Sequence, residues 1–205
     1  MIVAREGYPY IIVPALLAIA LFAIGYWQIA LPFVLLAAFM AYFFRDPQRR
    51  TPLDENVIVS PADGRVTRVR QMAPEDGSPT IVSIFLSPLD VHINRAPIAG
   101  TITDVTYQHG KFLMATHEDS SLVNEQNALT IQGTKVTVVC KQIAGILARR
   151  IICWKRAGDE VTIGERFGLI KFSSRTDLII PAGVEIEIRE GMRVRGGVTI
   201  IGRIL

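Results

Sequence analysis

The chain has 205 residues, a formal net charge of +3 at neutral pH and 20% charged residues. Its 22 Lys and Arg are dispersed among 19 Asp and Glu without a basic stripe interleaved with aromatic residues, which disfavours a nucleic-acid binder. The length fits one domain with an appendage.

The N-terminal region is more apolar than an ordinary soluble domain. No charged residue lies between Glu6 and Arg45, and this stretch is nearly twice the roughly 20 residues that one helix needs to cross a bilayer. Gly-Tyr-Trp-Gln at 25–28 interrupts it and leaves two apolar arms, residues 8–24 and 29–44. We expect a helical hairpin that anchors the chain. A spanning hairpin, a re-entrant hairpin and one long tilted span are all compatible with these lengths.

Arginines flank the apolar stretch and indicate its orientation. Arg5 precedes it, and Arg-Asp-Pro-Gln-Arg-Arg follows at 45–50. Because cytoplasmic flanks are enriched in Lys and Arg, both ends of a hairpin are expected in the cytoplasm. The same arginines would meet anionic lipid head groups. We therefore expect an anchor with a basic flank at 1–50 on the cell membrane, and a domain at 51–205 on its cytoplasmic face.

Beyond Pro52 the hydrophobic period changes to two, which is typical of strands. The expected strands are residues 56–60, 65–70, 80–86, 101–105, 128–132, 135–140 and 184–189. Residues 142–155 are ambiguous, because their β-branched content favours a strand while their length permits a helix. The fold class is therefore mainly β (α+β), with the helices in the N-terminal hairpin.

An internal repeat refines this prediction. Residues 61–69 and 97–105 share the pattern Pro-x-x-Gly-x-(Val/Ile)-Thr-x-Val, in which the glycine permits a tight turn before a strand. Such turn-strand units resemble the flattened barrel of biotinyl and lipoyl carrier domains, so we expect a barrel-sandwich-like domain. A non-catalytic adaptor domain of a membrane assembly is the second functional interpretation, although no exposed lysine stands at a hairpin tip as a carrier requires.

The cysteines and histidines do not indicate a metal site. Cys140 and Cys153 lie in or beside apolar runs and are expected to be free thiols, because their spacing makes neither a zinc site nor a disulfide framework. The three histidines, His92, His109 and His117, show neither HExxH nor another recognised zinc spacing. No metal is therefore expected.

A serine pair, Ser173 and Ser174, lies between two apolar runs. Serine pairs usually mark turns, whereas a nucleophilic serine needs a base or a strained backbone to activate it. Alternation along residues 89–97 places His92 on the polar side of a run that ends at a proline. Asp63 precedes a glycine, which most often marks a hairpin. A lone histidine more often has a structural role than a catalytic one, and for His92 the pattern favours neither role over the other.

Four segments, in order, resemble the short prokaryotic (type II-like) phosphatidylserine decarboxylases. They are Pro-Ala-Asp-Gly at 61–64, Asp-Val-His at 90–92, the loop at 110–127 with His117, and Arg-Phe-Gly-Leu-Ile-Lys-Phe-Ser-Ser-Arg-Thr-Asp-Leu at 166–178. The resemblance runs from about residue 45 to the C-terminus, and an N-terminal hydrophobic anchor is usual in this family.

The resemblance implies self-cleavage between Ser173 and Ser174, giving a β chain of residues 1–173 and an α chain that begins at 174. Ser174 would be the nucleophile and become a covalent pyruvoyl group, which forms a Schiff base with phosphatidylserine, so no dissociable cofactor is needed. His92, oriented by Asp63, would be the base, and His117 is the second candidate for proton transfer.

The family usually has Gly where this chain has Ser173. Serine resists strained backbone angles that glycine accepts, so the resemblance leaves the rate of cleavage open. The expected partners are the membrane and the lipid substrate, and the head group alone does not separate phosphatidylserine from an ether-linked archaeal analogue. The sequence does not determine the oligomeric state, and a homo-oligomer is compatible with it.

Overall fold

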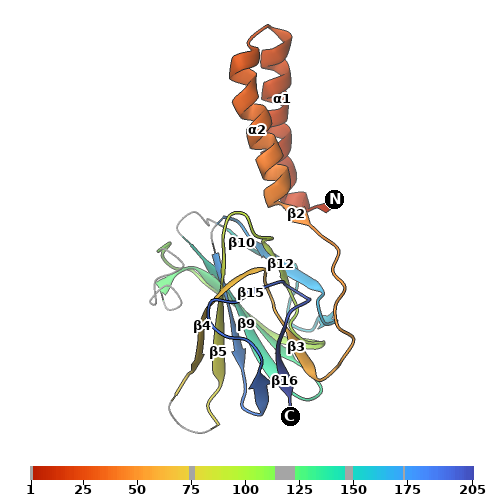
Figure 1. The fold of residues 1–205 in the computed structure, drawn as a ribbon, viewed down its shortest axis with the longest axis vertical. Coiled ribbons are helices and arrows are strands. Elements are labelled where there is room, and N and C mark those ends of the chain that lie inside the picture. The colour runs from red at the N-terminus through yellow and green to blue at the C-terminus, as the bar shows by residue number, and fades with distance from the viewer. Residues whose placement is uncertain (1, 74–76, 114–122, 146–149, 173) are drawn as a thin grey trace. The chain divides into compact units, whose positions relative to one another are not determined.

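The structure is a computed structural model that describes residues 2–73, 77–113, 123–145, 150–172 and 174–205. It divides into two compact units, Met1–Gln48 and Arg49–Leu205. The first holds the helices and the second holds a β domain (Figure 1). The predicted fold class, mainly β with an N-terminal helical hairpin, is confirmed. His117 and Ser173 lie outside the described residues.

The first unit is an antiparallel helical hairpin. A short 3-10 helix η1 (Arg5–Gly7) leads into α1 (Tyr8–Ala23), and α2 (Trp27–Phe43) follows a turn at Gly25, whose φ is 87°. Strands β1 (Ile2–Val3) and β2 (Arg45–Asp46) pair at its base. The helix Arg5–Ala23 is long and apolar enough to cross a membrane, and α2 is a shorter apolar helix.

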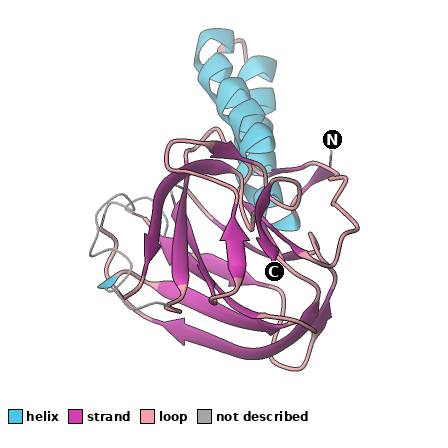
Figure 2. Ribbon diagram, turned by 60° about the horizontal axis from the view of Figure 1, so that its bottom comes forward, coloured by secondary structure: helices cyan, strands magenta, loops and turns pink. Residues whose placement is uncertain are grey.

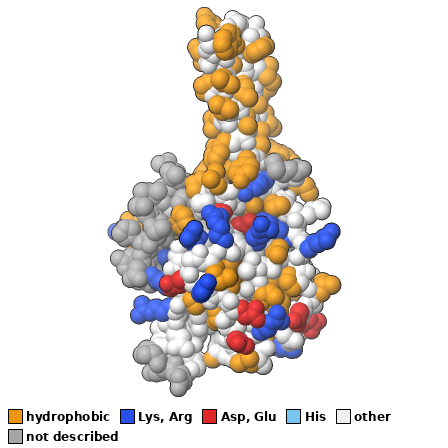
Figure 3. Space-filling view, in the orientation of Figure 1, with side chains coloured by type: hydrophobic (Ala, Val, Ile, Leu, Met, Phe, Trp, Pro, Cys, Tyr) orange, Lys and Arg blue, Asp and Glu red, His pale blue; other side chains and the backbone are white. Residues whose placement is uncertain are grey.

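Most side chains of the two helices have no protein neighbour to cover them. Leu16, Ile19 and Phe22 on α1 are between 60% and 70% exposed, as is Leu35 on α2. Figure 3 shows hydrophobic side chains over the surface of the hairpin. A helix that is apolar all round needs an apolar surrounding, so this surface suits the interior of a bilayer.

The second unit contains three antiparallel sheets. The largest is curled and has the order β11-β7-β8-β9-β13-β5-β4-β15, and two three-stranded sheets have the orders β10-β12-β6 and β14-β16-β3 (Figure 2). Their bounds are β3 (Val57–Val59), β4 (Gly64–Gln71), β5 (Thr80–Leu86), β6 (Ile93–Arg95), β7 (Gly100–Gln108), β8 (Gln126–Gln132), β9 (Thr137–Ala144), β10 (Ile151–Cys153), β11 (Glu160–Val161), β12 (Arg166–Ile170), β13 (Ser174–Ile180), β14 (Val184–Ile186), β15 (Arg193–Val194) and β16 (Ile200–Ile204).

The ambiguous segment 142–155 contributes to two strands and to no helix among its described residues. Its start continues β9 to Ala144, and β10 covers Ile151–Cys153. The β-branched content of this segment was therefore a better guide than its length. Residues 146–149 lie outside the described residues.

The sequence repeat corresponds to a repeated structure. Gly64 and Gly100 begin β4 and β7 with φ of 153° and 158°, and each strand has a register shift near its start. A Cβ would lie 2.1 Å from the Phe85 carbonyl oxygen at Gly64, and 2.2 Å from that of Gln132 at Gly100. Only glycine allows these strands to approach so closely.

One face of the large sheet carries the hydrophobic core. Leu178 and Ile180 on β13 pack there with residues of β4, β5, β8 and β9, including Val66, Ile84, Leu129 and Cys140. Because side chains alternate along a strand, Ser174 and Thr176 share this face with Leu178. Arg175 and Asp177 point to the other face, where they form a bidentate ion pair with two contacts of 2.8 Å.

The Arg175–Asp177 pair predicts a large loss of stability when one partner is removed. The two side chains are 4% and 0% exposed. Asp177→Ala would leave the guanidinium of Arg175 buried without its counter-charge, so we expect a loss of about 3–5 kcal/mol in the free energy of unfolding, measured by urea denaturation. Glu187→Ala, which breaks an exposed pair with Arg203, should cost about 1 kcal/mol or less. Equal losses would contradict this prediction.

Candidate active site

Ser174 begins the central strand β13 and is fully buried. It pairs with Leu86 on β5 and with Ala144 on β9. Its Oγ has no hydrogen-bond partner among the described residues. Leaving a buried hydroxyl unpaired is unfavourable, and native structures rarely do so without a functional reason. Ser83 Oγ on β5 is in the same state, so Ser174 is distinguished by its position directly after the segment that contains Phe172.

The backbone just before the serine pair is strained. Phe172 has a φ of 60°, the only positive φ of a non-glycine residue in the described part of the chain. The left-handed region costs an L-residue roughly 1–2 kcal/mol, because its Cβ crowds the following carbonyl. Strain of this kind gathers at reactive sites, where the surrounding structure maintains it.

His92 is held by the turn that follows β5. The backbone amide and hydroxyl of Ser87 donate to Asp90 Oδ2 at 2.9 and 2.7 Å, and His92 Nδ1 lies 3.0 Å from the Asp90 carbonyl oxygen. A carbonyl can only accept, so the hydrogen bond requires the proton on Nδ1. In the neutral ring this leaves the basic lone pair on Nε2, which is the form that a general base needs.

One hydrogen bond joins the strand that follows His92 to the strand that begins at Ser174. Strand β12 runs antiparallel to β6, and the Ile170 amide donates to the His92 carbonyl at 3.3 Å. Asn94 Nδ2, two residues after His92, donates to Thr176 Oγ1, two residues after Ser174, at 2.9 Å. The segments that carry the two candidate residues are therefore in contact.

A buried chain of side-chain hydrogen bonds joins β6 to the large sheet. Gln142 Nε2 on β9 donates to Asn94 Oδ1 at 2.9 Å, and Asn127 Nδ2 on β8 donates to Gln142 Oε1 at 3.0 Å. With the bond from Asn94 to Thr176, the chain ties β6 to three strands of the large sheet. All four side chains are at most 2% exposed, so each relies on the next to satisfy its polar groups.

Asp63 lies at the same edge of the large sheet, two strands from Ser174. It directly precedes β4, in which Arg65 pairs with Phe85, and Leu86 pairs with Ser174. Its Oδ1 accepts from the Gly196 amide at 2.8 Å and its Oδ2 from Arg49 Nη2 at 2.6 Å. The expected orientation of His92 by Asp63 stays a prediction, because the acceptor seen at Nδ1 is the Asp90 carbonyl.

Two opposing effects act on the Asp63 carboxyl. Burial raises its pKa above the usual value for aspartate, and the nearby Asp90 carboxylate raises it further. The positive charge of Arg49 and the hydrogen bonds from Arg49 and Gly196 lower the pKa but do not cancel the effect of burial. Asp63 is therefore a partly buried acid whose ionisation depends on one arginine.

Two residues near the candidate site residues are not predicted from the sequence as part of the site. Asp90 belongs to the Asp-Val-His motif, but only the structure shows that its carbonyl contacts His92 and that its Oδ1 lies 3.1 Å from Arg193 Nη1. Arg49 belongs to the basic flank, and only the structure shows its contact with Asp63. The one local signal for these contacts is the position of Asp90 two residues before His92.

Metal ligands and reactive thiols are not found among the described residues. No group of three or more His, Cys, Asp or Glu in that part of the chain could hold a metal ion. Cys140 and Cys153 are free, and burial raises the pKa of both thiols above the usual range. Neither is therefore an activated nucleophile.

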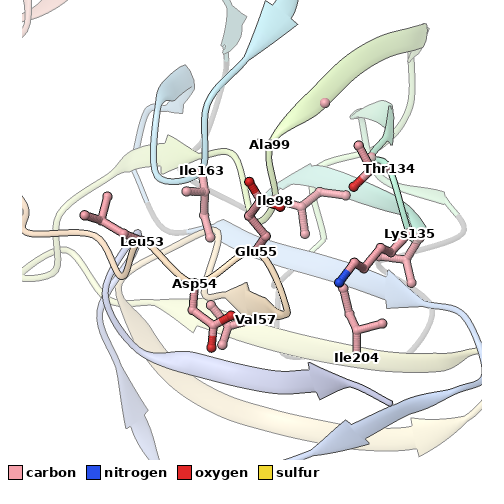
Figure 4. Close-up of a pocket in the computed structure, with 13 residues that line it drawn as sticks. Leu53, Asp54, Glu55, Val57, Ile98, Ala99, Thr134, Lys135, Ile163 and Ile204 are labelled. Atoms are coloured by element: carbon pink, nitrogen blue, oxygen red, sulfur yellow. The ribbon is translucent and has the colours of Figure 1, made fainter.

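A pocket of about 190 Å³ lies away from Ser174 (Figure 4). Its lining includes Gly133 and Lys135 in the turn between β8 and β9, and Ile204 at the end of β16. Ser174 pairs with Ala144, at the other end of β9. This pocket is thus at the opposite edge of the sheet and does not belong to the candidate active site.

The described residues combine a buried serine hydroxyl without a hydrogen-bond partner with a buried histidine on a segment that contacts the same strand. Comparison with known proteins identifies the family. The phosphatidylserine decarboxylase family model matches residues 36–202. The chain belongs to this family and is a decarboxylase, so the adaptor interpretation is not supported.

Relatives named phosphatidylserine decarboxylase proenzyme align with nearly the whole chain. The one from Symbiobacterium thermophilum is 46% identical over 210 residues, covering 99% of this chain and 96% of its own. The one from Solibacter usitatus is 52% identical over 174 residues, covering 85% and 83%. The one from Geotalea uraniireducens is 40% identical over 205 residues, covering 98% and 95%.

The strain at Phe172 predicts an effect on any reaction of the next peptide bonds. Phe172→Gly should relax the backbone and let the segment leave its constrained conformation, slowing conversion of the full-length chain into fragments by roughly tenfold. Phe172→Leu, which retains the Cβ and the apolar character, should process at a rate close to wild type. Processing can be followed by gel electrophoresis after cell-free synthesis, and unchanged kinetics in Phe172→Gly would contradict a role for strain.

Proposed function

We propose that this chain is a proenzyme that cleaves itself between Ser173 and Ser174 and then decarboxylates phosphatidylserine to phosphatidylethanolamine at the cytoplasmic face of the cell membrane. The observation that carries the proposal is the buried Oγ of Ser174 at the start of β13, which has no partner among the described residues and follows the strained backbone at Phe172. The names of the relatives support the substrate and the proenzyme state.

The first reaction uses only the chain's own groups and one water. Ser174 Oγ attacks the carbonyl carbon of Ser173, its proton passes to a base, and the peptide nitrogen leaves as an amine, which gives an ester. Loss of the Ser174 α-proton then breaks the Cβ–O bond and releases the Ser173 carboxylate. The dehydroalanine left at position 174 tautomerises to an imine, which water hydrolyses to a ketone and ammonia. The products are a β chain of residues 1–173 and an α chain from 174.

The described residues fit the formation of a pyruvoyl group, because Ser174 Oγ is buried, unpaired and next to a strained segment. This group supplies an electron-withdrawing carbonyl that accepts the substrate amine and takes up the electrons released as carbon dioxide leaves. His92 Nε2 is the proposed base in self-cleavage and the first choice for proton transfer to the product carbon. His117 is the second choice.

Asp63 is proposed to act on His92 through its charge. A carboxylate near the imidazole favours the imidazolium that forms when His92 takes a proton. The Asp90 carbonyl holds Nδ1 and thereby fixes the tautomer. Ser174, His92 and Asp63 are thus proposed to act as nucleophile, base and supporting carboxylate.

The anchor matches the substrate. A phospholipid stays in its bilayer, so the enzyme must be held where head groups lie. The apolar helix Arg5–Ala23 is suited to this task, and Arg5 and Arg45, one at each end of the hairpin, favour the cytoplasmic side. Phosphatidylethanolamine formation would place the chain in phospholipid biosynthesis.

Mass spectrometry of the denatured protein tests the proposal. Wild type should yield an α fragment that starts at position 174 and carries a ketone instead of an amino terminus. Ser174→Ala should stay full length and inactive, because alanine has no nucleophile, while Ser83→Ala, which alters another buried hydroxyl, should still be cleaved. An intact wild-type chain without decarboxylase activity would overturn the proposal.

Separate measurements of self-cleavage and of decarboxylation distinguish the roles of His92 and His117. His92→Ala should slow self-cleavage by roughly 10²–10⁴-fold, the usual contribution of a general base. His117→Ala should leave cleavage within a few-fold of wild type and act on decarboxylation. His109→Ala is the matched control, with little effect on either reaction. A His92→Ala chain that cleaves at the wild-type rate would exclude His92 as the base.

A further inference from the structure

We propose that Arg49 is a positioning residue for self-cleavage, because its guanidinium keeps the partly buried Asp63 carboxyl ionised. This inference rests on the proposed role of Asp63 in processing. Arg49 Nη2 lies 2.6 Å from Asp63 Oδ2, and the two side chains are only 13% and 15% exposed. It is the first residue of the β domain, three residues after the end of β2.

The contacts of Asp63 make its charge depend on this arginine. The carboxylate has two hydrogen-bond donors, Arg49 on Oδ2 and the Gly196 amide on Oδ1. Only the arginine carries a positive charge. The amide satisfies one oxygen and fixes the position of the carboxyl, but it cannot balance a full negative charge in a site from which most water is excluded.

The other charged groups around Asp63 do not replace Arg49. The Asp90 carboxylate, on the turn after β5, opposes ionisation of Asp63. Arg193 on β15 is 3.1 Å from Asp90 and is directed to that acid instead. His92 contacts the Asp90 carbonyl, and a proton on its ring would favour the Asp63 carboxylate only after the base has acted. Among the described residues, Arg49 is thus the cation that stabilises the Asp63 carboxylate before His92 takes up a proton.

The rate of self-cleavage should depend on pH through Asp63. A protonated Asp63 cannot stabilise the imidazolium of His92, so the rate falls as pH falls through the pKa of Asp63. This fall is the acid limb of the pH–rate profile. Arg49 lowers that pKa. An opposite charge in direct contact typically lowers the pKa of a carboxyl by about 1–3 units, so removing Arg49 should move the acid limb of the profile to higher pH by at least about one unit.

The experiment uses the full chain, made by cell-free synthesis into detergent micelles and transferred to buffers over a range of pH. Loss of full-length chain gives the rate at each pH. In Arg49→Gln, we expect the midpoint of the acid limb to move to higher pH by about one pH unit or more. At pH values above this limb, the cleavage rate should return toward that of wild type. A merely structural defect would lower the rate at every pH.

Two variants give matched controls. Arg50→Gln removes the same charge from the next residue, which is exposed, and should leave the profile unchanged. Arg49→Lys retains a cation and should restore most of the wild-type profile, although a lysine cannot reproduce the planar guanidinium. A shift in Arg50→Gln equal to that in Arg49→Gln would show a general charge effect and overturn the inference.

A double-mutant test covers the case in which Arg49→Gln also weakens folding. In an Asp63→Asn background, adding Arg49→Gln should neither move the acid limb nor lower the rate further, because the two residues act as a unit. The role of Arg49 would be overturned by additive losses in the double mutant, by a uniform loss of rate at all pH values, or by faster processing without Arg49.

Failure of the proposed function would look different. The wild-type chain would then not be cleaved, or the Ser174→Ala chain would be cleaved.

Discussion

The burial of polar groups along the central strand β13 is the constraint on which the site depends. Ser174, Thr176 and Asp177 are fully buried in a strand with neighbours on both sides. Thr176 and Asp177 are satisfied, one by Asn94 and the other by Arg175. Ser174 Oγ alone among these three has no partner in the described residues. The satisfied groups fix the strand on both faces and so determine where the unsatisfied hydroxyl lies.

The second constraint is electrostatic and concerns Asp63. Burial favours the neutral acid, whereas the proposed chemistry needs the carboxylate, and the pKa of Asp63 records the balance between them. Arg49 and the Gly196 amide come from segments far apart in the sequence, before β3 and after β15. The ionisation of Asp63 therefore depends on tertiary contacts that form only when the β domain is folded.

The two units of the chain meet different requirements. The hairpin exposes an uncharged apolar surface, which is suited to a membrane, and the β domain buries its own core. Family membership links them, because the lipid head group is the reactive part of the substrate and its acyl chains remain in the membrane. The pocket lined by Lys135 and Ile204 is at the sheet edge opposite the candidate residue Ser174.

The sequence by itself determined the hairpin, the alternating strands, the turn-strand repeat and the identity of Ser174, His92 and Asp63 as candidates. These features rest on local patterns: an uncharged run, a period of two, and short motifs. Only the tertiary structure decided that the Asp90 carbonyl holds His92, that Arg49 balances Asp63, and that Asn94 aligns β6 with β13. Such contacts join residues up to 133 positions apart, as between Asp63 and Gly196, and they arise from strand pairing, which no local pattern encodes.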